Sequence, residues 1–289
     1  MGDVIVGSEA VAEGRITRGR LRWNYRAIYP DVYLPCDAPA TLRDRTLGAW
    51  LWSGRRSVVT GRAAAALHGA KWVDEAAPVE LLYANNRAPE GIVARRERIA
   101  DDETCELFDM RVASPVRTAL DLGRHLRPES AVIHLDALAA ATGITEPDVL
   151  GLTQRYAGTK GVRMCREAVA LMDGGAQSPK ESWLRLLLTR SGFPPLQTQI
   201  PLLDRHGHRF AYLDMGWPER RIAVEYDGDH HRTDRAQYAW DVQRLRLVTQ
   251  LGWMHVRVIA EDRPYDIVDR VRRAWAHRER EAMAVKLPA

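Results

Sequence analysis

The stretch that decides the fold of the C-terminal part is Phe210-Ala-Tyr-Leu-Asp-Met-Gly-Trp-Pro-Glu-Arg-Arg-Ile-Ala-Val-Glu-Tyr-Asp-Gly-Asp-His-His231. Apolar and polar residues alternate in both halves of it, a pattern that predicts two short strands joined by a tight turn. Glu225 and Asp227 then share one face of the second strand. A turn centred between residues 219 and 220 sets Asp214 directly across from Glu225. The pattern therefore places three carboxylates on one patch of sheet.

Such a cluster is costly unless a cation offsets it. Two unit charges about 5 Å apart repel each other by roughly 3 kcal/mol at an effective dielectric constant of about 20. A bound divalent metal ion, a shifted pKa or neighbouring arginines would relieve the repulsion. The alternative is a solvent-facing hairpin whose acidic residues only keep it soluble. The pattern alone leaves both interpretations open.

Size and composition place the chain among folded proteins. Its 289 residues allow two domains, and its hydrophobic content of 46% argues against disorder. We find no apolar run long enough for a membrane span and no signal-peptide pattern at the N-terminus. The scattered Cys36, Cys105 and Cys165 argue against a zinc ribbon or a disulfide framework, and they favour the reducing cytoplasm. Arginine carries most of the positive charge, a skew that suits phosphate recognition and can also reflect genome composition.

Residues 5–36 have the outline of a winged helix-turn-helix. Helices are expected over about 5–13, with Ser8 as N-cap, and over Thr17–Asn24, followed by a hairpin over Tyr25–Pro35. The second helix is the candidate recognition helix, because DNA-reading helices use basic side chains for phosphates and guanine edges. The alternative is an ordinary solvated basic face. The candidate DNA contacts are Arg18, Arg20, Arg22 and, just after the helix, Arg26.

The middle of the chain, to residue 172, shows helices and strands without a chemical motif. Thr60 is expected to cap an alanine-rich helix that ends at His68, which we interpret as a helix-end residue rather than a ligand. Ser114 is expected to cap a helix whose first residue is Pro115. We expect this portion to provide packing and spacing. The other expected helices cover residues 42–52, 130–142, 147–156 and 162–172, and the expected strands cover residues 79–84, 92–97 and 105–112.

The N-terminal region resembles AbiEi-type antitoxins, a winged-helix family of transcriptional repressors. The shared features are the basic helix, the wing over Tyr25–Tyr33, an apolar helix through Ala63–Gly69 and, more weakly, the segment Ser114–Leu122. The resemblance implies a DNA-binding region over residues 1–172. It also implies DNA as a partner and raises a toxin as a second one.

A second domain is expected over residues 178–280, after a linker at Asp173–Gln177 whose two adjacent glycines break the preceding helix. Ser178 opens a helix with a capping box whose third position is Glu181. The order of expected elements is α-β-β-β-α-β-α, so we expect a two-domain protein of α+β or α/β class. The further elements are a strand at 195–203, the opening hairpin, a helix at 232–251, a strand at 253–259 and a helix at 265–277.

This order resembles the αβββαβ restriction-endonuclease-like core of the PD-(D/E)XK nuclease superfamily, in the branch related to very-short-patch-repair endonucleases. The resemblance implies Mg²⁺, with Mn²⁺ as a substitute, held by Asp214, Glu225 and Asp227. Glu181 would either orient a metal-bound water or only cap its helix. Arg244 would steady the acidic patch or contact a DNA phosphate. The matching positions are Glu181, Asp214, Glu225-Tyr-Asp-Gly228, Asp241, Arg244 and Gly252-Trp253.

One position departs from the family pattern. These nucleases usually have a lysine two residues after the glutamate, whereas this chain has Asp227. His230, His231 or Arg244 would then take over the lysine's role, with His231 preferred of the two histidines because imidazole accepts a proton near neutral pH. Alternatively, Asp227 is a further metal ligand, or the domain is a catalytically inactive remnant.

The resemblances together imply metal-assisted hydrolysis of phosphodiester bonds by a DNA endonuclease in repair or defence, with the winged helix bringing it to DNA. The alternative is an antitoxin-like repressor whose nuclease-fold domain is inactive. A third interpretation is a nuclease directed at RNA, because the metal chemistry does not distinguish the sugars. The expected location is the cytoplasm, and a homodimer is left open.

Overall fold

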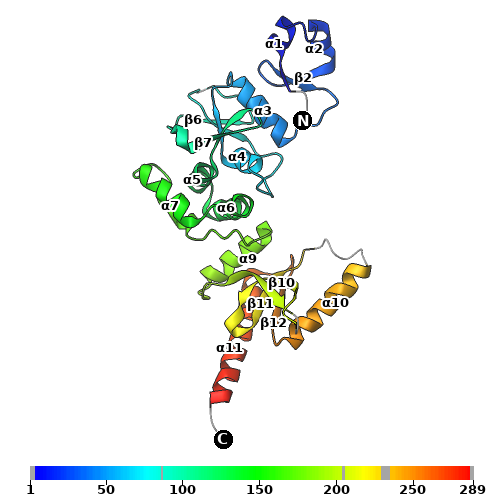
Figure 1. Ribbon diagram of the computed structural model, residues 1–289, viewed down its shortest axis with the longest axis vertical. Helices are drawn as coiled ribbons and strands as arrows, with labels where there is room; N and C mark the ends of the chain where they lie inside the picture. Colours follow the sequence, from blue (N-terminus) through cyan, green and yellow to red (C-terminus); the bar gives the residue numbers. More distant parts are fainter. Residues whose placement is uncertain (1–3, 86, 204–205, 229–234, 287–289) are drawn as a thin grey trace. The chain divides into compact units, whose positions relative to one another are not determined.

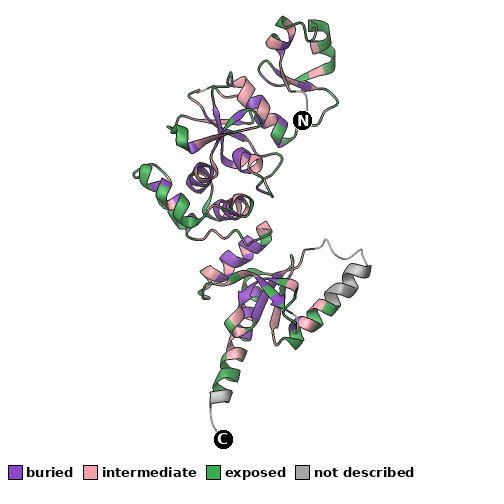
Figure 2. Cartoon of the chain, viewed as in Figure 1, coloured by how far each residue is buried: buried purple, intermediate pink, exposed green. Residues whose placement is uncertain are grey.

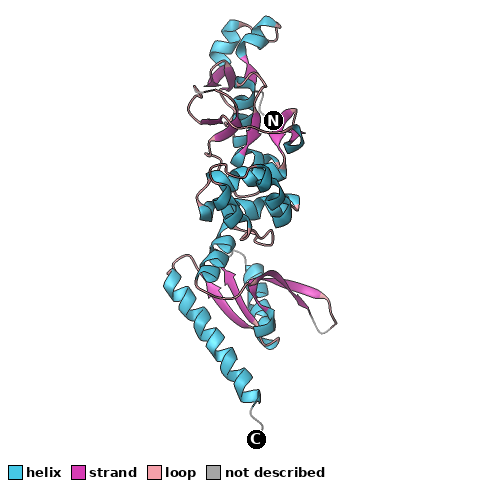
Figure 3. Ribbon diagram, turned by 90° about the vertical axis from the view of Figure 1, so that its left-hand side faces the viewer, coloured by secondary structure: helices cyan, strands magenta, loops and turns pink. Residues whose placement is uncertain are grey.

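The computed structural model describes residues 4–85, 87–203, 206–228 and 235–286 (Figure 1). The chain divides into two compact units, Met1–Gly174 and Gly175–Ala289, and each is described by itself. Both units combine helices with β-sheets (Figure 3), so the expected mixed α/β class is confirmed. Within the ranges given above, no helix has the length and apolar character needed to cross a membrane.

The first unit begins with two short helices and a small antiparallel sheet of order β1-β3-β2. Thr17 Oγ1 accepts a hydrogen bond from the amide of Arg20 at 3.1 Å, so Thr17 is the N-cap of a helix that begins one residue later than expected. The prediction for Ser8 is wrong, because the helix already begins at Gly7. The amide and hydroxyl of Ser8 instead donate to the carboxylate of Asp31 in the hairpin turn, at 3.0 and 2.5 Å. The elements are β1 (Ile5–Val6), α1 (Gly7–Ala12), α2 (Arg18–Asn24), β2 (Tyr25–Tyr29) and β3 (Val32–Pro35).

A second sheet, of order β6-β5-β4-β8-β7, forms the centre of the first unit. Residues 105–112 do not form the single strand that we expected. Phe108 and Asp109 both have positive φ, 53° and 61°, and reverse the chain between β7 and β8. Strand β4 is absent from the sequence-based expectation. The strands are β4 (Val58–Thr60), β5 (Val79–Leu82), β6 (Ile92–Arg95), β7 (Thr104–Leu107) and β8 (Met110–Ala113).

Three helices pack against this second sheet, and one of them, α5, is buried along most of its length (Figure 2). Ser114 Oγ accepts a hydrogen bond from the amide of Arg117 at 3.3 Å, which confirms the predicted cap of α5. Thr60 occupies the N-cap position of α4, as predicted, but its hydroxyl donates to Asp121 at 2.6 Å instead of bonding to an amide of the helix. His68 lies at the C-cap of α4, as predicted. The helices are α3 (Leu42–Trp52), α4 (Gly61–Leu67), α5 (Pro115–His125), α6 (Pro128–Thr142), α7 (Glu146–Arg155) and α8 (Val162–Val169).

The second unit has the predicted order α-β-β-β-α-β-α. Its sheet has the order β12-β11-β10-β9, in which β12 is parallel to β11 and the other pairs are antiparallel. The last helix continues past the expected end at His277, through a segment rich in the helix-forming residues Glu, Arg, Ala and Met. The elements are α9 (Pro179–Arg190), β9 (Gln197–Leu203), β10 (Arg209–Trp217), β11 (Ile222–Tyr226), α10 (Arg235–Gln250), β12 (Met254–Val258) and α11 (Pro264–Lys286).

The register of the β10–β11 hairpin is the one that the sequence predicts. Met215 pairs with Val224 and Trp217 pairs with Ile222, which centres the turn between residues 219 and 220. The next position along this register sets Asp214 across from Glu225. The position of the turn is therefore sufficient to predict that Asp214 and Glu225 lie across from each other.

Both faces of β11 are covered by other elements. Val224 packs with Leu184 of α9 in one buried cluster, and Ala223 packs with Val248 of α10 in another. This burial overturns the interpretation of a solvent-facing hairpin, because the carboxylate on β11 lies within a packed sheet and not on a free surface.

Candidate functional sites

Asp214, on β10, is a half-buried carboxylate in a negative environment. Its Oδ2 accepts a hydrogen bond from the amide of Tyr226 at 3.2 Å, which fixes Asp214 at the end of β11. Burial raises the pKa of Asp214 to about 7, and the negative charges of Glu225 and Glu181 act in the same direction. A carboxylate in such surroundings gains strongly from a nearby cation.

Glu225, on β11, is only 7% exposed and is held by two bases. Arg244 of α10 contacts both of its carboxylate oxygens and also donates to the carbonyl of Tyr212 at 2.6 Å. His255 Nε2 of β12 contacts Oε2 of the same carboxylate. Burial alone would raise the pKa of Glu225, but the hydrogen bonds from His255 and Arg244 outweigh it and lower the pKa to about 2. Glu225 is therefore ionised at neutral pH.

Glu181 reaches the same patch from the first turn of α9 and is 9% exposed. Its amide donates to Ser178 Oγ at 3.2 Å, so the predicted cap is present. Its carboxylate accepts a hydrogen bond from the amide of Gln177 at 2.9 Å and not from that of Ser178, so the reciprocal half of the predicted capping box is displaced by one residue. Because the charge of Glu181 also raises the pKa of Asp214, Glu181 contributes both to the helix end and to the acidic patch.

Asp227 follows the end of β11 and is bound on both its backbone and its side chain. Its amide donates to the carbonyl of Val258 at 2.7 Å, and its Oδ2 forms an ion pair with Arg257 of β12. The parallel pairing of β11 with β12 sets Arg257 beside Glu225. Strand β12 therefore supplies one base to each acid of the Glu-Tyr-Asp sequence.

The donor chemistry of the acidic patch fits Mg²⁺, because carboxylate oxygens are the ligands that this ion prefers. The predicted ligands are not gathered into a cage, however. In the described part of the chain, the group of three possible ligands whose donor atoms all lie within 4.8 Å of one another is in the first unit and does not include Asp214. Glu225 and Asp227 face protein bases instead. A cation bound to Asp214 and Glu225 would therefore share the carboxylate of Glu225 with Arg244 and His255.

Three predicted site residues cannot be compared with the structure. His230 and His231 lie outside the described residues, and so does the side chain of Asp241. The histidine that the structure places on Glu225 is His255, which the sequence reasoning missed. The place of His255 in the closing strand could have indicated this contact, but only with knowledge of the register between β11 and β12.

The basic helix α2 is exposed along most of its length (Figure 2). None of its residues is buried, and its sequence carries no acidic residue. Trp23 on this helix is 77% exposed, and the guanidinium of Arg22 lies 5.6 Å from the centre of its ring. Arg26, in β2, donates to the carbonyl of Ala38 at 2.9 Å and so partly serves the local fold. The exposed arginines of α2 are Arg18, Arg20 and Arg22.

The first unit also holds a buried ionic network that the sequence reasoning missed. Arg117 is fully buried on α5, and it donates to Glu103 at 2.6 Å and to Asp121 at 3.0 Å. On the same helix, Arg124 donates to Glu97 at 2.6 Å. The signal was the pair of opposite charges four residues apart, Arg117 and Asp121, on a helix that also carries apolar residues for burial.

Glu97, Asp121 and His125 are the possible ligands whose donor atoms lie within 4.8 Å of one another. Burial raises the pKa of Asp121, and the hydrogen bond from His125 followed by that from Arg124 lowers the pKa of Glu97 to about 2. The guanidinium groups of Arg117 and Arg124 lie among these acids. We interpret the group as a structural ion cluster, because these arginines already supply its positive charge.

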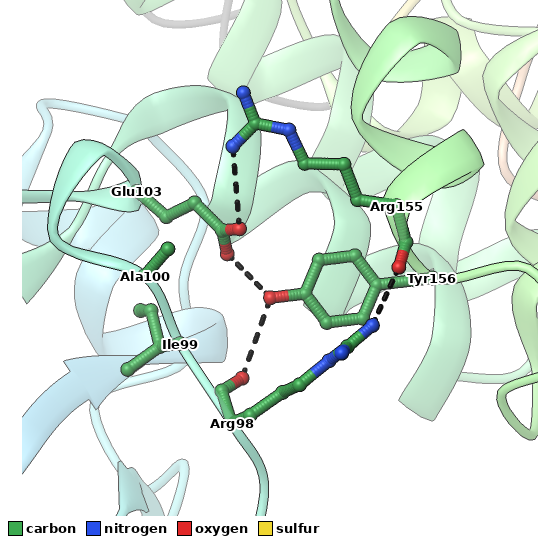
Figure 4. A pocket seen from close by; sticks show the side chains of 6 residues that line it. All are labelled: Arg98, Ile99, Ala100, Glu103, Arg155 and Tyr156. Carbon is green, nitrogen blue, oxygen red and sulfur yellow. Dashed lines mark hydrogen bonds and ion pairs between the residues drawn. The ribbon is translucent and has the colours of Figure 1, made fainter.

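An open pocket of about 340 Å³ lies beside this network (Figure 4). Tyr156 donates to Glu103 at 2.6 Å on one wall, and burial raises the pKa of Tyr156 to about 12. Arg98 stacks over the Tyr156 ring at 5.2 Å and donates to the carbonyl of Arg155 at 2.6 Å. Through these contacts, the polar groups drawn in Figure 4 have partners within the protein. We therefore interpret the pocket as part of the surface of the ion network.

The chain is similar to two curated proteins of Mycobacterium tuberculosis that are described as uncharacterized, one from strain CDC 1551 / Oshkosh and one from strain ATCC 25618 / H37Rv. Each is 29% identical over 149 residues, which cover 52% of this chain and 55% of the relative. The chain thus spans about half the length of the curated relatives it matches. No family model matches the chain, and no solved structure matches it.

Proposed function

We propose that the chain is a metal-dependent DNA endonuclease whose first unit contacts DNA through α2 and whose second unit hydrolyses phosphodiester bonds. The observation that carries the proposal is the convergence of three carboxylates from three elements. Glu181 of α9, Asp214 of β10 and Glu225 of β11 lie close enough for their charges to raise the pKa of Asp214. A fold holds like charges together at such a cost mainly where they serve a function.

Asp214 and Glu225 are the residues that would hold Mg²⁺. When bound there, the ion would polarise a phosphate oxygen and lower the pKa of a water molecule. Arg244 and His255 keep Glu225 ionised and fix the position of its carboxylate within the packed sheet. Glu181 fixes the start of α9 beside Asp214 and adds negative charge that favours cation binding.

Helix α2 is the proposed DNA contact of the first unit. Its three arginines face solvent without an acidic neighbour on the helix, so their charge is available to phosphates. An exposed tryptophan beside them suits a contact with a sugar or a base edge. The winged helix-turn-helix is the DNA-binding fold we propose for residues 5–36.

The test of this function is digestion of plasmid, single-stranded and mismatched DNA in Mg²⁺ and in Mn²⁺. The variants Asp214→Ala and Glu225→Ala should abolish cleavage. Glu219→Ala is the matched control. Glu219 is an exposed acid in the turn of the same hairpin, so this variant should cleave DNA like the wild type. Equal digestion by all four proteins would show that a contaminating nuclease, or another site, is responsible.

A second candidate function has its own supporting observation. Glu225 and Asp227 are neutralised by protein bases, which is also the arrangement expected of an acid pair that binds no metal. The chain would then be an antitoxin-like, DNA-binding repressor with an inactive second unit, and a toxin would be a possible partner. This alternative predicts duplex binding that depends on α2, no cleavage, and no heat of Mg²⁺ binding in calorimetry.

A further inference from the structure

Gln199 has a backbone conformation that is unusual for a residue within a β-strand. It lies in β9 with a φ of 49°, in the left-handed region that residues with a Cβ atom rarely adopt. Such outliers persist where the surrounding structure holds them, and they cluster at functional sites. The position of Gln199 in the sheet and its side-chain contact indicate what this conformation serves.

The sheet sets Gln199 next to the acidic patch. In the order β11-β10-β9, Asp214 has Glu225 across from it on one side and Gln199 across from it on the other. The three residues therefore occupy matching positions on three neighbouring strands. The pairs that flank Gln199 and Asp214 in the register of β9 with β10 are Ile200 with Leu213 and Thr198 with Met215.

The side chain of Gln199 connects β9 to the segment before α9. Gln177 Nε2 donates a hydrogen bond to Gln199 Oε1 at 3.0 Å. The backbone amide of Gln177 donates to the carboxylate of Glu181 at 2.9 Å. Gln177 is thus bonded both to the strand beside Asp214 and to the third acid of the patch. We propose that Gln199 is a positioning residue, which holds the carboxylate of Glu181 at the acidic patch through Gln177.

The carboxylate of Glu181 gains from such a support because it is buried near another acid. Glu181 is only 9% exposed, and its charge acts on Asp214, whose pKa it helps to raise. Repulsion between the two acids favours a rotation of the Glu181 side chain away from the patch. Ser178 accepts a hydrogen bond from the backbone amide of Glu181 and so fixes the helix end rather than the carboxylate. The hydrogen bond from Gln177 acts on the carboxylate itself.

The same contact gives a reason for a glutamine at a position of positive φ. Glycine adopts this conformation freely, but it has no side chain that could accept a hydrogen bond from Gln177. Asparagine tolerates positive φ as well, but its amide is one methylene shorter than that of glutamine. Residue 199 therefore combines an unfavourable backbone conformation with the side-chain length that the contact needs.

The positioning role rests on the proposed function, because it concerns acids that would act on Mg²⁺. Its test is calorimetric titration of the full chain with MgCl₂, which requires no cleavage. In Gln199→Asn the side chain is too short for the contact, and we expect the Kd for Mg²⁺ to rise about tenfold. Gln177→Ala should have the same effect, and the double variant should bind no more weakly than either single variant, because both changes break one hydrogen bond. Gln197→Ala, at an exposed position of the same strand, is the control and should bind Mg²⁺ like the wild type.

Two further variants separate positioning from a role in the fold. Gln199→Glu keeps an accepting oxygen at the same distance from the backbone, so it should bind Mg²⁺ at least as tightly as the wild type. Gln199→Asn should keep the wild-type midpoint of urea denaturation in EDTA, and Gln199→Gly replaces it if it fails to fold. Mg²⁺ binding by Gln199→Glu as weak as that by Gln199→Asn would overturn the positioning role.

The remaining outcomes separate this role from the proposed function. If the wild type binds Mg²⁺ and the Gln199 and Gln177 variants bind it as tightly as Gln197→Ala, the positioning role is overturned and the proposed function stands. Losses that multiply in the double variant would show that the two glutamines act independently, and would also overturn the role. A wild type that binds no Mg²⁺ would overturn the proposed function and the positioning role together.

Discussion

The carboxylate of Asp214 on β10 accepts a hydrogen bond from the backbone amide of Tyr226 on β11 at 3.2 Å. This bond fixes Asp214 next to Glu225, the residue that precedes Tyr226. The surroundings of the two acids shift their pKa values in opposite directions. Burial and nearby charge raise the pKa of Asp214 to about 7, whereas His255 and Arg244 lower that of Glu225 to about 2. At neutral pH, Glu225 is thus ionised and Asp214 is near the midpoint of its titration. A cation bound nearby would favour the ionised form of Asp214.

Replacement of Asp214 should stabilise the metal-free protein at high pH. The folded-state pKa of Asp214 is raised, so its contribution to stability is fully present below about pH 4 and is lost as pH rises through about 7. Above about pH 7 the wild type carries an unfavourable buried charge that Asp214→Asn removes. We expect a gain on the order of 1–3 kcal/mol in the free energy of unfolding at about pH 8, and a clearly smaller gain at about pH 5, where only part of the contribution of Asp214 has been lost.

Urea denaturation in EDTA at the two pH values measures this difference. Glu219→Gln, in the exposed turn of the same hairpin, is the matched control and should change stability little at either pH. A loss of stability in Asp214→Asn at high pH would show that the carboxylate is favourably placed without a cation.

Addition of Mg²⁺ should stabilise the wild type and not Asp214→Asn. A ligand that binds only the folded state at about one hundred times its Kd raises the free energy of unfolding by about 2.7 kcal/mol. Thermal denaturation across a Mg²⁺ titration measures the gain, with Glu219→Gln expected to respond like the wild type. The same gain in Asp214→Asn would place the bound ion elsewhere.

The buried ion network of the first unit should depend strongly on Arg117. Arg117→Ala leaves Glu103 and Asp121 buried without their shared counterion, and we expect a loss of about 3–5 kcal/mol in the free energy of unfolding. Arg163→Ala is the control, because the Arg163 side chain is 91% exposed and its ion pair with Glu167 should contribute less than about 1 kcal/mol. Chemical denaturation of both variants tests the contrast, and equal losses would argue against a structural network.

The arginines of α2 should set the salt dependence of DNA binding by the first unit. Three phosphate contacts at about 0.9 each predict that Arg18→Gln, Arg20→Gln and Arg22→Gln together lower the slope of log K against log salt by about 2.7. Fluorescence anisotropy with a labelled duplex measures the slope, and Arg163→Gln provides an exposed control on another helix. An unchanged affinity in the triple variant would remove α2 from the interface.

Local sequence patterns predicted those parts of the fold whose structure depends on one short segment. The cap at Ser114 and the turn that pairs Asp214 with Glu225 are both of this kind. The hairpin between β7 and β8 was missed because its turn uses Phe108 and Asp109 at positive φ, where a glycine or asparagine would have signalled it.

The sequence predicted only the part of the acidic site that lies on the β10–β11 hairpin. His255 and Arg257 reach the acids through the parallel pairing of β12 with β11, a contact between segments about thirty residues apart that no local pattern encodes. The network around Arg117 was missed for the same reason, because its partner Glu103 lies on a different element.

The central claim is most directly tested by Mg²⁺-dependent cleavage of plasmid DNA by the wild type beside Asp214→Asn, a variant of nearly the same size without the charge. We predict nicking or linearisation by the wild type and by Glu219→Gln, no product with EDTA, and a loss of at least about a hundredfold in rate for Asp214→Asn, as expected when a metal ligand is removed. Cleavage by Asp214→Asn at the wild-type rate, or intact plasmid with every protein, would contradict the account.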